Sequence, residues 1–392
     1  MTEDLSAFMT DLALDLEEEE INVEDLNDIE TNIEYPHLLL RTDDVLKVIK
    51  VIGPIINLKS TRNIPKSLTL YWDDEVLKYL ITDDLSYFTQ KVHLLNEGNI
   101  LKETLCIPLN IIQAASKSFG KSILIYKKED NYFLRLATGD LILDLVKPEE
   151  QLLKKPGVIG NEILFTSSSS LGDALKVTLP ILSCENIPEK RKLTFVNNNI
   201  EFTTGKFLIL YEIEVPDMKI SYKAAEFLKS LCNLYSGALY FYEDQKNTNR
   251  IHIKCQDIEY TTFVGKDNIT NDVGNFITEK NKSNGVWVSM RDFNSIVTLA
   301  SSLNYAIGSI NFNINKEGNL VVEIPNTRGT SSFVINRQQG ILNLGENNNS
   351  VSVLSKSLKK LLGSFYGDSI YINVQSDCVV LKVGPITGVL LK

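Results

Sequence analysis

The side chains that most often perform catalysis or bind metals are few and scattered along this 392-residue chain. The histidines, His37, His93 and His252, stand in three unrelated stretches, and none has a cysteine or carboxylate partner at metal-ligand spacing. The cysteines lie singly in apolar stretches, as buried small side chains do in a reducing compartment. They are Cys106, Cys184, Cys232, Cys255 and Cys378. We therefore expect no metal and no cofactor.

Adjacent carboxylates occur at three places, Asp43–Asp44, Asp73–Asp74 and Asp83–Asp84. All three pairs coincide with predicted turns or helix starts, where aspartate is favoured for its local hydrogen bonds. The sequence also lacks the nucleophile elbow of serine hydrolases, the phosphate-binding Walker loop and the dinucleotide fingerprint. These observations predict a protein that is not an enzyme and has no catalytic residues.

Basic side chains recur on the predicted helices. On any single helix they are typical of a solvated face. If the helices are related by symmetry, however, their charges add up to one positive stripe, which suits contacts with phosphates that do not depend on base sequence. The candidate DNA-binding residues are Lys47, Lys50, Lys117, Lys121, Lys176, Lys223, Lys229, Arg291, Lys356, Lys359 and Lys360.

The helices that carry these charges belong to a unit of basic helix, glycine and strand that occurs three times. In the last unit Leu358, Leu361 and Leu362 form the apolar side of the helix, and Gly367 is predicted to end it. The units lie at 107–126, 220–242 and 353–374, and their closing glycines are Gly120, Gly237 and Gly367. Spacings of 117 and 130 residues are too long for a solenoid repeat and predict three tandem domains of one fold.

Each predicted domain contains a helix, strands, a second helix and more strands, which indicates an α+β fold built from a doubled βαβββ unit. The first helix of each domain carries an aspartate that we expect near its start, namely Asp44, Asp173 and Asp292. The polar, asparagine-rich segment from Gly265 to Ser283 is interpreted as a linker. The predicted domain boundaries are 36–153, 158–268 and 283–392, preceded by an acidic extension at 1–35.

The net charge of −10 comes from this acidic extension. Residues 1–34 hold thirteen acidic and no basic side chains, which leaves 40 basic against 37 acidic side chains in the rest of the chain. A weak apolar stripe from Phe8 to Leu16 leaves two interpretations open, a solvated extension or a docking arm that binds a partner surface. No apolar run approaches the roughly 18 residues of a membrane span, and no secretory signal is present, so we expect a cytoplasmic protein that binds no membrane.

The chain resembles the bacterial-type DNA sliding clamp, the DNA polymerase III beta subunit family, over about 38–392. The segment FTTGKFLIL at 202–210 is similar to the family's Thr-Asp-Gly-x-x-Leu turn, and ITDDLSYF at 81–88 resembles the matching turn of the first domain. Thr204 replaces the acid of that turn, and Phe207 stands where the family often has arginine. These departures and the acidic arm suggest a divergent, viral member.

The resemblance implies three tandem DNA-clamp domains, with helices on one side and sheets on the other, and two chains that close head to tail into a homodimer ring. It implies that the ring encircles double-stranded DNA, tethers a DNA polymerase as a processivity factor, and is opened by a clamp loader. Partners of the family insert a short hydrophobic peptide between the second and third domains. Carried over by position, that pocket would be lined by Thr203, Gly205, Phe207, Leu208, Val389, Leu390 and Leu391.

Two other functions remain compatible with the sequence. A clamp-like chain that does not close would serve as a transcription co-activator or as an accessory subunit of a polymerase. A β-rich structural or assembly protein is the third possibility, but it gives no reason for lysines to recur on the helices. We also consider that the arm at 1–34 docks on the partner pocket of its own or a neighbouring chain.

Overall fold

The structure is a computed structural model that describes residues 33–392, except for short internal gaps. The gaps are 57–65, 84, 116–119, 137, 149, 184, 188–189, 205–206, 267–268, 270–271, 281–284, 304–307, 327 and 339–349. The acidic arm and its apolar stripe therefore lie outside the described residues, as do Lys117 and Gly205. Within the described part of the chain, no helix is both long and apolar enough to cross a membrane.

The chain divides into two compact units, which are described separately. The first comprises 1–156 and 256–262, and the second comprises 157–255 and 263–392. In the first unit, a four-stranded antiparallel sheet has the order β1 (His37–Arg41), β6 (Ser122–Lys128), β7 (Asn131–Leu136) and β8 (Gly139–Leu143). The other strands of this unit have the order β5 (Leu105–Pro108), β2 (Ser67–Asp73), β3 (Val76–Thr82), β4 (Ser86–Lys91) and β16 (Ile258–Phe263).

The first unit contains the helices α2 (Thr42–Ile52), α3 (Leu109–Ala115) and the short α4 (Glu150–Leu153). Helix α2 forms where the sequence predicts it, with Asp43 and Asp44 in its first turn. Carboxylates are favoured there because they complement the positive end of the helix dipole. Val45, Val48, Ile49 and Ile52 are buried, so one apolar face of the helix packs on the core.

The second unit is built on an eight-stranded antiparallel sheet. Its order is β13 (Met218–Ser221), β10 (Lys192–Val196), β11 (Asn199–Thr203), β12 (Phe207–Glu212), β24 (Ile386–Leu391), β23 (Cys378–Val383), β22 (Ser369–Val374) and β17 (Val286–Ser289). Strands β9 (Ile159–Ser167), β14 (Ala238–Asp244) and β15 (Arg250–Cys255) are adjacent in that order. A four-stranded sheet has the order β20 (Gly329–Ile335), β19 (Leu320–Asn326), β18 (Ser309–Ile314) and β21 (Ser350–Leu354).

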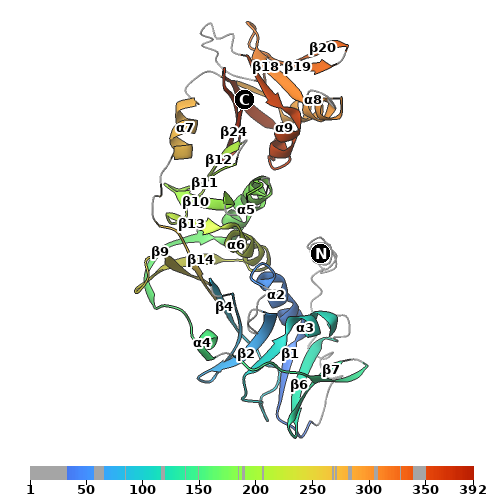
Figure 1. The fold of residues 1–392 in the computed structure, drawn as a ribbon, viewed down its shortest axis with the longest axis vertical. Coiled ribbons are helices and arrows are strands. Elements are labelled where there is room, and N and C mark those ends of the chain that lie inside the picture. Colours follow the sequence, from blue (N-terminus) through green and yellow to red (C-terminus); the bar gives the residue numbers. More distant parts are fainter. Residues whose placement is uncertain are drawn as a thin grey trace. The chain divides into compact units, whose positions relative to one another are not determined.

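Helices cover both faces of the eight-stranded sheet in the second unit. They are α5 (Ser168–Leu182), α6 (Tyr222–Leu234), α7 (Asp272–Lys280), α8 (Met290–Leu303) and α9 (Ser355–Leu362). Figure 1 shows α7 on one side of β11, β12 and β24, with α5 and α9 on the other side. The central strands are thus buried on both faces, and neighbouring residues along a strand contact opposite helices.

Strands β12 and β24 join the sequence-distant halves of this sheet, with Leu208 opposite Val389 and Ile209 opposite Gly388. Leu208 and Val389 face α7. Gly388 faces α9, because a Cβ there would lie 3.1 Å from Leu361 Cδ2 and 3.2 Å from Phe365 Cζ. The glycine therefore lets α9 approach the sheet closely.

Two of the three closing glycines of the repeat unit, Gly237 and Gly367, have a different role from the predicted one. Helix α9 ends at Leu362 with Gly363 as its C-cap, so Gly367 does not end it. Gly367 instead precedes β22, where a Cβ would lie 2.9 Å from Val383 Cγ1. Gly237 has φ of +121° and lies at the entry to β14 rather than at the end of α6.

Two of the three aspartates lie where the sequence predicts them. Asp44 and Asp292 are in the first turns of α2 and α8. Asp173 is not in the first turn of α5, because that helix begins at Ser168. Asp173 instead forms a solvent-exposed ion pair with Lys176, three residues further along the helix. The distance from Lys176 Nζ to Asp173 Oδ1 is 3.2 Å.

Candidate functional site

The basic residues of the first unit lie on neighbouring elements. Lys47 is exposed on α2 and Lys50 is half-buried on the same helix, while Lys121 is exposed just before β6. The loop before β6 is held against the start of α2, because Thr42 donates from Oγ1 to the Gly120 carbonyl at 2.6 Å. The Thr42 amide also donates to the Lys121 carbonyl at 3.1 Å. The structure thus brings Lys121 next to the N-terminus of the helix that carries Lys47.

In the second unit the basic residues lie on two packed helix pairs. Helix α5 packs on α6, and Gly172 permits a close approach, since a Cβ there would lie 3.0 Å from Cys232 Cβ. Lys176 is exposed on α5, and Lys223 and Lys229 are half-buried on α6. The ion pair of Lys176 with Asp173 is solvent-exposed, so it contributes little to stability and leaves the ammonium group in water.

Helices α8 and α9 form the second packed pair. Arg291 is exposed in the first turn of α8. On α9 the side chains separate cleanly, with Leu358, Leu361 and Leu362 buried against the core. Lys356, Lys359 and Lys360 are exposed on the opposite side of the same helix. The three lysines therefore present a compact positive patch to solvent.

The described residues of the predicted partner pocket lie on β12, on β24 and at the end of β11, but they are divided between the two faces of the sheet. Phe207 lies opposite Leu390, and Leu208 lies opposite Val389. Phe207 and Leu390 are buried on the face that α7 does not cover, since side chains alternate along a strand. Thr203 is exposed, and Leu391 is 39% exposed at the end of the strand.

Helix α7 covers the other face of this junction and was not predicted from the sequence. Its Val273, Phe276 and Ile277 pack on an apolar cluster that includes the candidate pocket residues Leu208 and Val389. Leu210, Cys378 and Val380 complete this cluster, which we call the junction cluster. The only sequence signal for α7 is the spacing of one apolar triplet in the segment interpreted as a linker.

Both ends of α7 bind to the sheet through polar contacts. At the first turn, the Glu201 carboxylate accepts a hydrogen bond from the Gly274 amide at 3.1 Å. Burial raises the pKa of Glu201 to about 7, and the amides of Gly274 and Val273 act in the opposite direction. At the last turn, Lys280 Nζ lies 2.6 Å from Asp377 Oδ2. The Lys280 carbonyl also accepts from Asn373 Nδ2 at 3.3 Å and from the Gln375 side-chain amide.

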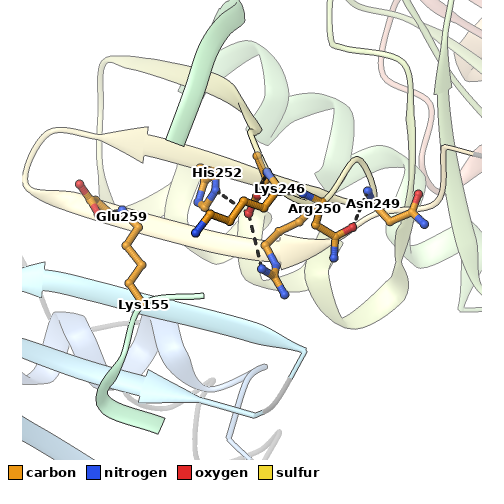
Figure 2. A network of polar contacts seen from close by, with 8 residues as sticks. Lys155, Lys246, Asn249, Arg250, His252 and Glu259 are labelled. Carbon is orange, nitrogen blue, oxygen red and sulfur yellow. Dashed lines mark hydrogen bonds and ion pairs between the residues drawn. The ribbon is translucent and has the colours of Figure 1, made fainter. Parts of the chain in front are cut away.

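The most enzyme-like cluster in the second unit is built around the buried Asp244. His252 Nε2 and Arg250 Nη1 approach its carboxylate at 3.1 and 3.5 Å, and Figure 2 shows both side chains directed at the same group. The amides of Lys246 and Asn247 donate to its other oxygen at 2.8 and 3.0 Å. Backbone hydrogen bonds and His252 together hold the pKa of Asp244 below its usual range, despite its burial.

The Asp244 contacts close the turn between β14 and β15. A Cβ on Gly157 would overlap the Asp244 carboxylate, so the chain also passes directly over this group. These contacts fix a carboxylate among donors of its own chain, which is a structural arrangement rather than a site for a substrate. His37 Nδ1 donates to the Tyr35 carbonyl, and His93 pairs with Asp257 in the first unit. In the described ranges, no group of three or more His, Cys, Asp or Glu side chains is arranged to hold a metal ion.

Comparison of the sequence with models of protein families gave no match. Comparison with curated proteins likewise gave none. Comparison of the structure with solved structures gave strong matches at low sequence identity. One is a putative DNA polymerase III beta subunit from Eubacterium rectale, with a TM-score of 0.72, 12% identity, and coverage of 91% of this chain and 98% of that one.

Two further matches contain bound ligands. The sliding clamp of Bartonella birtlesii bound to griselimycin has a TM-score of 0.72 at 16% identity, covering 91% of this chain and 99% of that one. The Helicobacter pylori beta clamp bound to a DNA ligase peptide has a TM-score of 0.71 at 14% identity, with the same coverage. The chain therefore has the α+β fold of the DNA polymerase III beta sliding clamp, with clamp domains in tandem, which confirms the predicted fold class and resemblance.

Proposed function

We propose that this chain is a DNA sliding clamp. Two copies would close head to tail into a ring that encircles duplex DNA and tethers a replicative DNA polymerase. The observation that supports ring closure most directly is a difference in the number of strands between the sheets. In the second unit, β12 and β24 join two four-stranded halves into one sheet of eight strands. The sheets that end in β8 and β20 have only four strands each.

The outer edges of β8 and β20 have the properties of surfaces that pair with another chain. Ile142 on β8 is 62% exposed and Val334 on β20 is 57% exposed. Among the described residues, no strand pairs with either outer edge. Exposed apolar edge strands attract further strands, and proteins normally cover or charge them. Antiparallel pairing of β8 with β20 of a second copy would make another eight-stranded sheet.

The charges that flank the two edges are complementary. Asp140 and Asp144 lie in and after β8, while Arg328 and Arg337 lie before and after β20. Antiparallel pairing would bring Asp144 toward Arg328 of the other chain, whereas Asp140 is already paired with Arg135 of its own chain at 2.9 Å. Opposite charges at such positions favour the correct register and partner more than they add affinity.

We further propose that the eleven basic residues predicted on or beside the helices contact the phosphates of DNA. Exposed lysines on helix surfaces give weak contacts that weaken with salt and do not depend on sequence. Enclosure by a ring would hold the DNA without tight binding, which leaves the protein free to slide. The proposal also includes a clamp loader as a partner, a viral source and a cytoplasmic location. It keeps the predicted domain boundaries 36–153, 158–268 and 283–392.

The decisive experiment combines solution mass with polymerase run length. Light scattering should give twice the 44.1 kDa mass of one chain, and the protein should lengthen synthesis by its own polymerase on circular templates. Substituting Lys356, Lys359 and Lys360 by Glu should reduce DNA association and lower the log–log salt slope by about 3. Lys316→Glu, on an exposed turn of the second unit, is the control and should leave both unchanged.

Two results would overturn the clamp function. An unchanged run length with the full-length protein would remove the processivity role. A monomer at micromolar concentration that still binds the polymerase would favour the alternative, an accessory subunit or transcription co-activator that does not close.

A further inference from the structure

Helix α9 differs from the other helices that carry predicted DNA-binding residues. It contains no carboxylate, whereas α2, α5, α6 and α8 each carry at least one aspartate or glutamate. Its three lysines, Lys356, Lys359 and Lys360, are exposed, and none of them forms an ion pair with another described residue. The exposed side of α9 is therefore the least neutralised positive surface among these helices.

Helices α8 and α9 are antiparallel neighbours. The amide of Met290, the first residue of α8, donates to the carbonyl of Asp368, which follows α9, at 2.9 Å. The amide of Ser355, the first residue of α9, donates to the carbonyl of Gly308, which follows α8, at 2.7 Å. The C-terminal end of α8 therefore lies beside the N-terminal end of α9.

The C-terminal end of α8 exposes two leucines one turn apart. Leu299 is 41% exposed and Leu303 is 54% exposed. Contact with DNA phosphates would account for the lysines of α9 but not for these leucines, because apolar surface gains free energy only when it is removed from water. We call the two leucines together with the three lysines of α9 the α8–α9 face. Its composition fits a ligand that is both acidic and apolar.

The acidic extension of this chain has that composition. Residues 1–34 hold thirteen acidic and no basic side chains, and six of the acidic residues fall within 11–20. Phe8, Leu12 and Leu16 follow one another at intervals of four residues, a spacing that puts side chains on one face of a helix. Amphipathic segments of this kind bind other proteins through such apolar anchors.

We propose that the acidic extension binds the α8–α9 face and competes there with DNA. Its apolar stripe contacts the two leucines, and its carboxylates pair with the three lysines. A tethered segment acts at an effective concentration in the millimolar range, so even a weak contact keeps the face covered. The extension would thus reduce binding of unspecific nucleic acids to free protein, and the phosphates of enclosed DNA would displace it. The competition rests on the proposed clamp function, whereas the contact itself does not.

The extension is long enough to reach this face on the other copy of the proposed ring. Strand β1, which follows the extension, is the edge strand opposite β8 in its sheet, and β21, which leads into α9, is the edge strand opposite β20. Pairing of β8 with β20 would separate β1 from β21 of the other copy by seven strand spacings, or about 34 Å along the sheet. The chain from Leu16 to Ile33 can extend over roughly 56 Å, which exceeds this separation.

Carbodiimide cross-linking of the full-length protein tests the contact directly, because this reagent joins a carboxylate only to an amine close to it. Mass spectrometry should find residues 11–20 joined to the lysines of α9. Lys316, which is exposed on a turn of the same unit, is the control and should not be joined to them. Cross-links from the extension that reach only lysines outside α9 would overturn the proposal.

A fluorescent peptide of residues 1–20 gives a second measurement. Its receptor is the full-length variant with Phe8→Ser, Leu12→Ser and Leu16→Ser, whose own extension competes less. Binding should be at least 10-fold weaker when the three lysines of α9 are also replaced by Glu, and at least three-fold weaker with Leu303→Asn. A scrambled peptide of the same composition and charge is the matched control and should bind at least five-fold more weakly. Equal binding of the two peptides would overturn a specific contact.

The competition with DNA is measured on the same triple serine variant. At low salt it should bind duplex DNA at least five-fold more tightly than the wild type, because its α8–α9 face is less covered. Equal DNA affinities would overturn the competition. The cross-linking and peptide measurements use neither DNA nor polymerase. A failed run-length assay would therefore overturn the clamp function and leave the contact standing, whereas failure of these two measurements would overturn the contact alone.

Discussion

β12 and β24 pair with each other inside one sheet, whereas β8 and β20 are edge strands with no partner on their outer sides among the described residues. At the junction, two strands from distant parts of the sequence pair over five residue positions, and helices cover both faces. At β8 and β20, apolar side chains of comparable size are exposed. A sheet joint in this fold therefore needs a partner strand and helical cover. The first joint has both within one chain, and we propose that the second obtains its partner strand from another copy.

The largest difference is expected for core substitutions at the junction. Leu390 is 1% exposed and pairs with Phe207, so Leu390→Ala should lower the free energy of unfolding by about 2–5 kcal/mol. The adjacent Leu391 is 39% exposed, and Leu391→Ala should change that free energy by no more than about 1 kcal/mol. Urea unfolding monitored by circular dichroism measures both variants. Equal losses would contradict the description of the junction as a closed core.

A substitution on the outer edge of β8 should affect self-association of the chain rather than its folding. Ile142→Asp places a charge on the outer edge of β8 and should weaken self-association at least about 100-fold, or roughly 2.7 kcal/mol, with the melting temperature of the monomer unchanged. Leu85→Asp is the matched control, because Leu85 is also an exposed aliphatic residue, 63% exposed, in the first unit. Analytical ultracentrifugation measures the association. A dimer that persists in Ile142→Asp would place the subunit contact elsewhere.

The smallest effect concerns the pH dependence of the junction. Glu201 has a folded-state pKa of about 7, above its unfolded value of 4.5, because burial disfavours the carboxylate. Asp272 in the first turn of α7 adds to this increase, and the two backbone amides oppose it. The native state therefore retains a proton that the unfolded state loses. The contribution of Glu201 to the free energy of unfolding therefore falls as the pH rises from about 4.5 to 7 and stays constant above pH 7.

Glu201→Gln tests this dependence directly. Glutamine keeps an oxygen for the Gly274 amide but does not titrate. Between pH 5 and pH 8, the free energy of unfolding of the wild type should therefore fall by about 1–3 kcal/mol more than that of Glu201→Gln. Chemical unfolding across this pH range measures the difference. Glu279→Gln, on the exposed side of α7, should retain the wild-type slope. A wild-type slope in Glu201→Gln would mean that other groups determine the pH dependence of the junction.

The sequence predicted the elements that depend on local patterns. The acidic start of α2 and the amphipathic character of α9 follow from the spacing of their residues, and the structure confirms both. The predicted role of Gly367 was wrong because the helix ends at Leu362, and the glycine is instead required by a close contact with Val383, which is distant in sequence. Local patterns indicate that a glycine is required, but not which neighbour requires it.

The junction site could be predicted only in part. The turn at 202–210 and the C-terminal strand were identified, and the structure pairs them as β12 and β24. Helix α7 was missed because most of its residues are polar, and its apolar triplet is significant only once the junction cluster is known. Glu201 was missed for a similar reason, since its burial and raised pKa arise from the tertiary packing of α7 on β11. Such properties are not encoded in any short window of sequence.

Gly388 has a consequence that extends beyond packing. Its missing side chain leaves room for Leu361 and Phe365, so this one strand position sets how far α9 stands from the sheet. The three exposed lysines of α9 move with the helix. Even a methyl group at position 388 would require Leu361 or Phe365 to shift by a few tenths of an ångström. Gly388 thus acts as a spacer, because it determines how far the three lysines of α9 extend from the sheet.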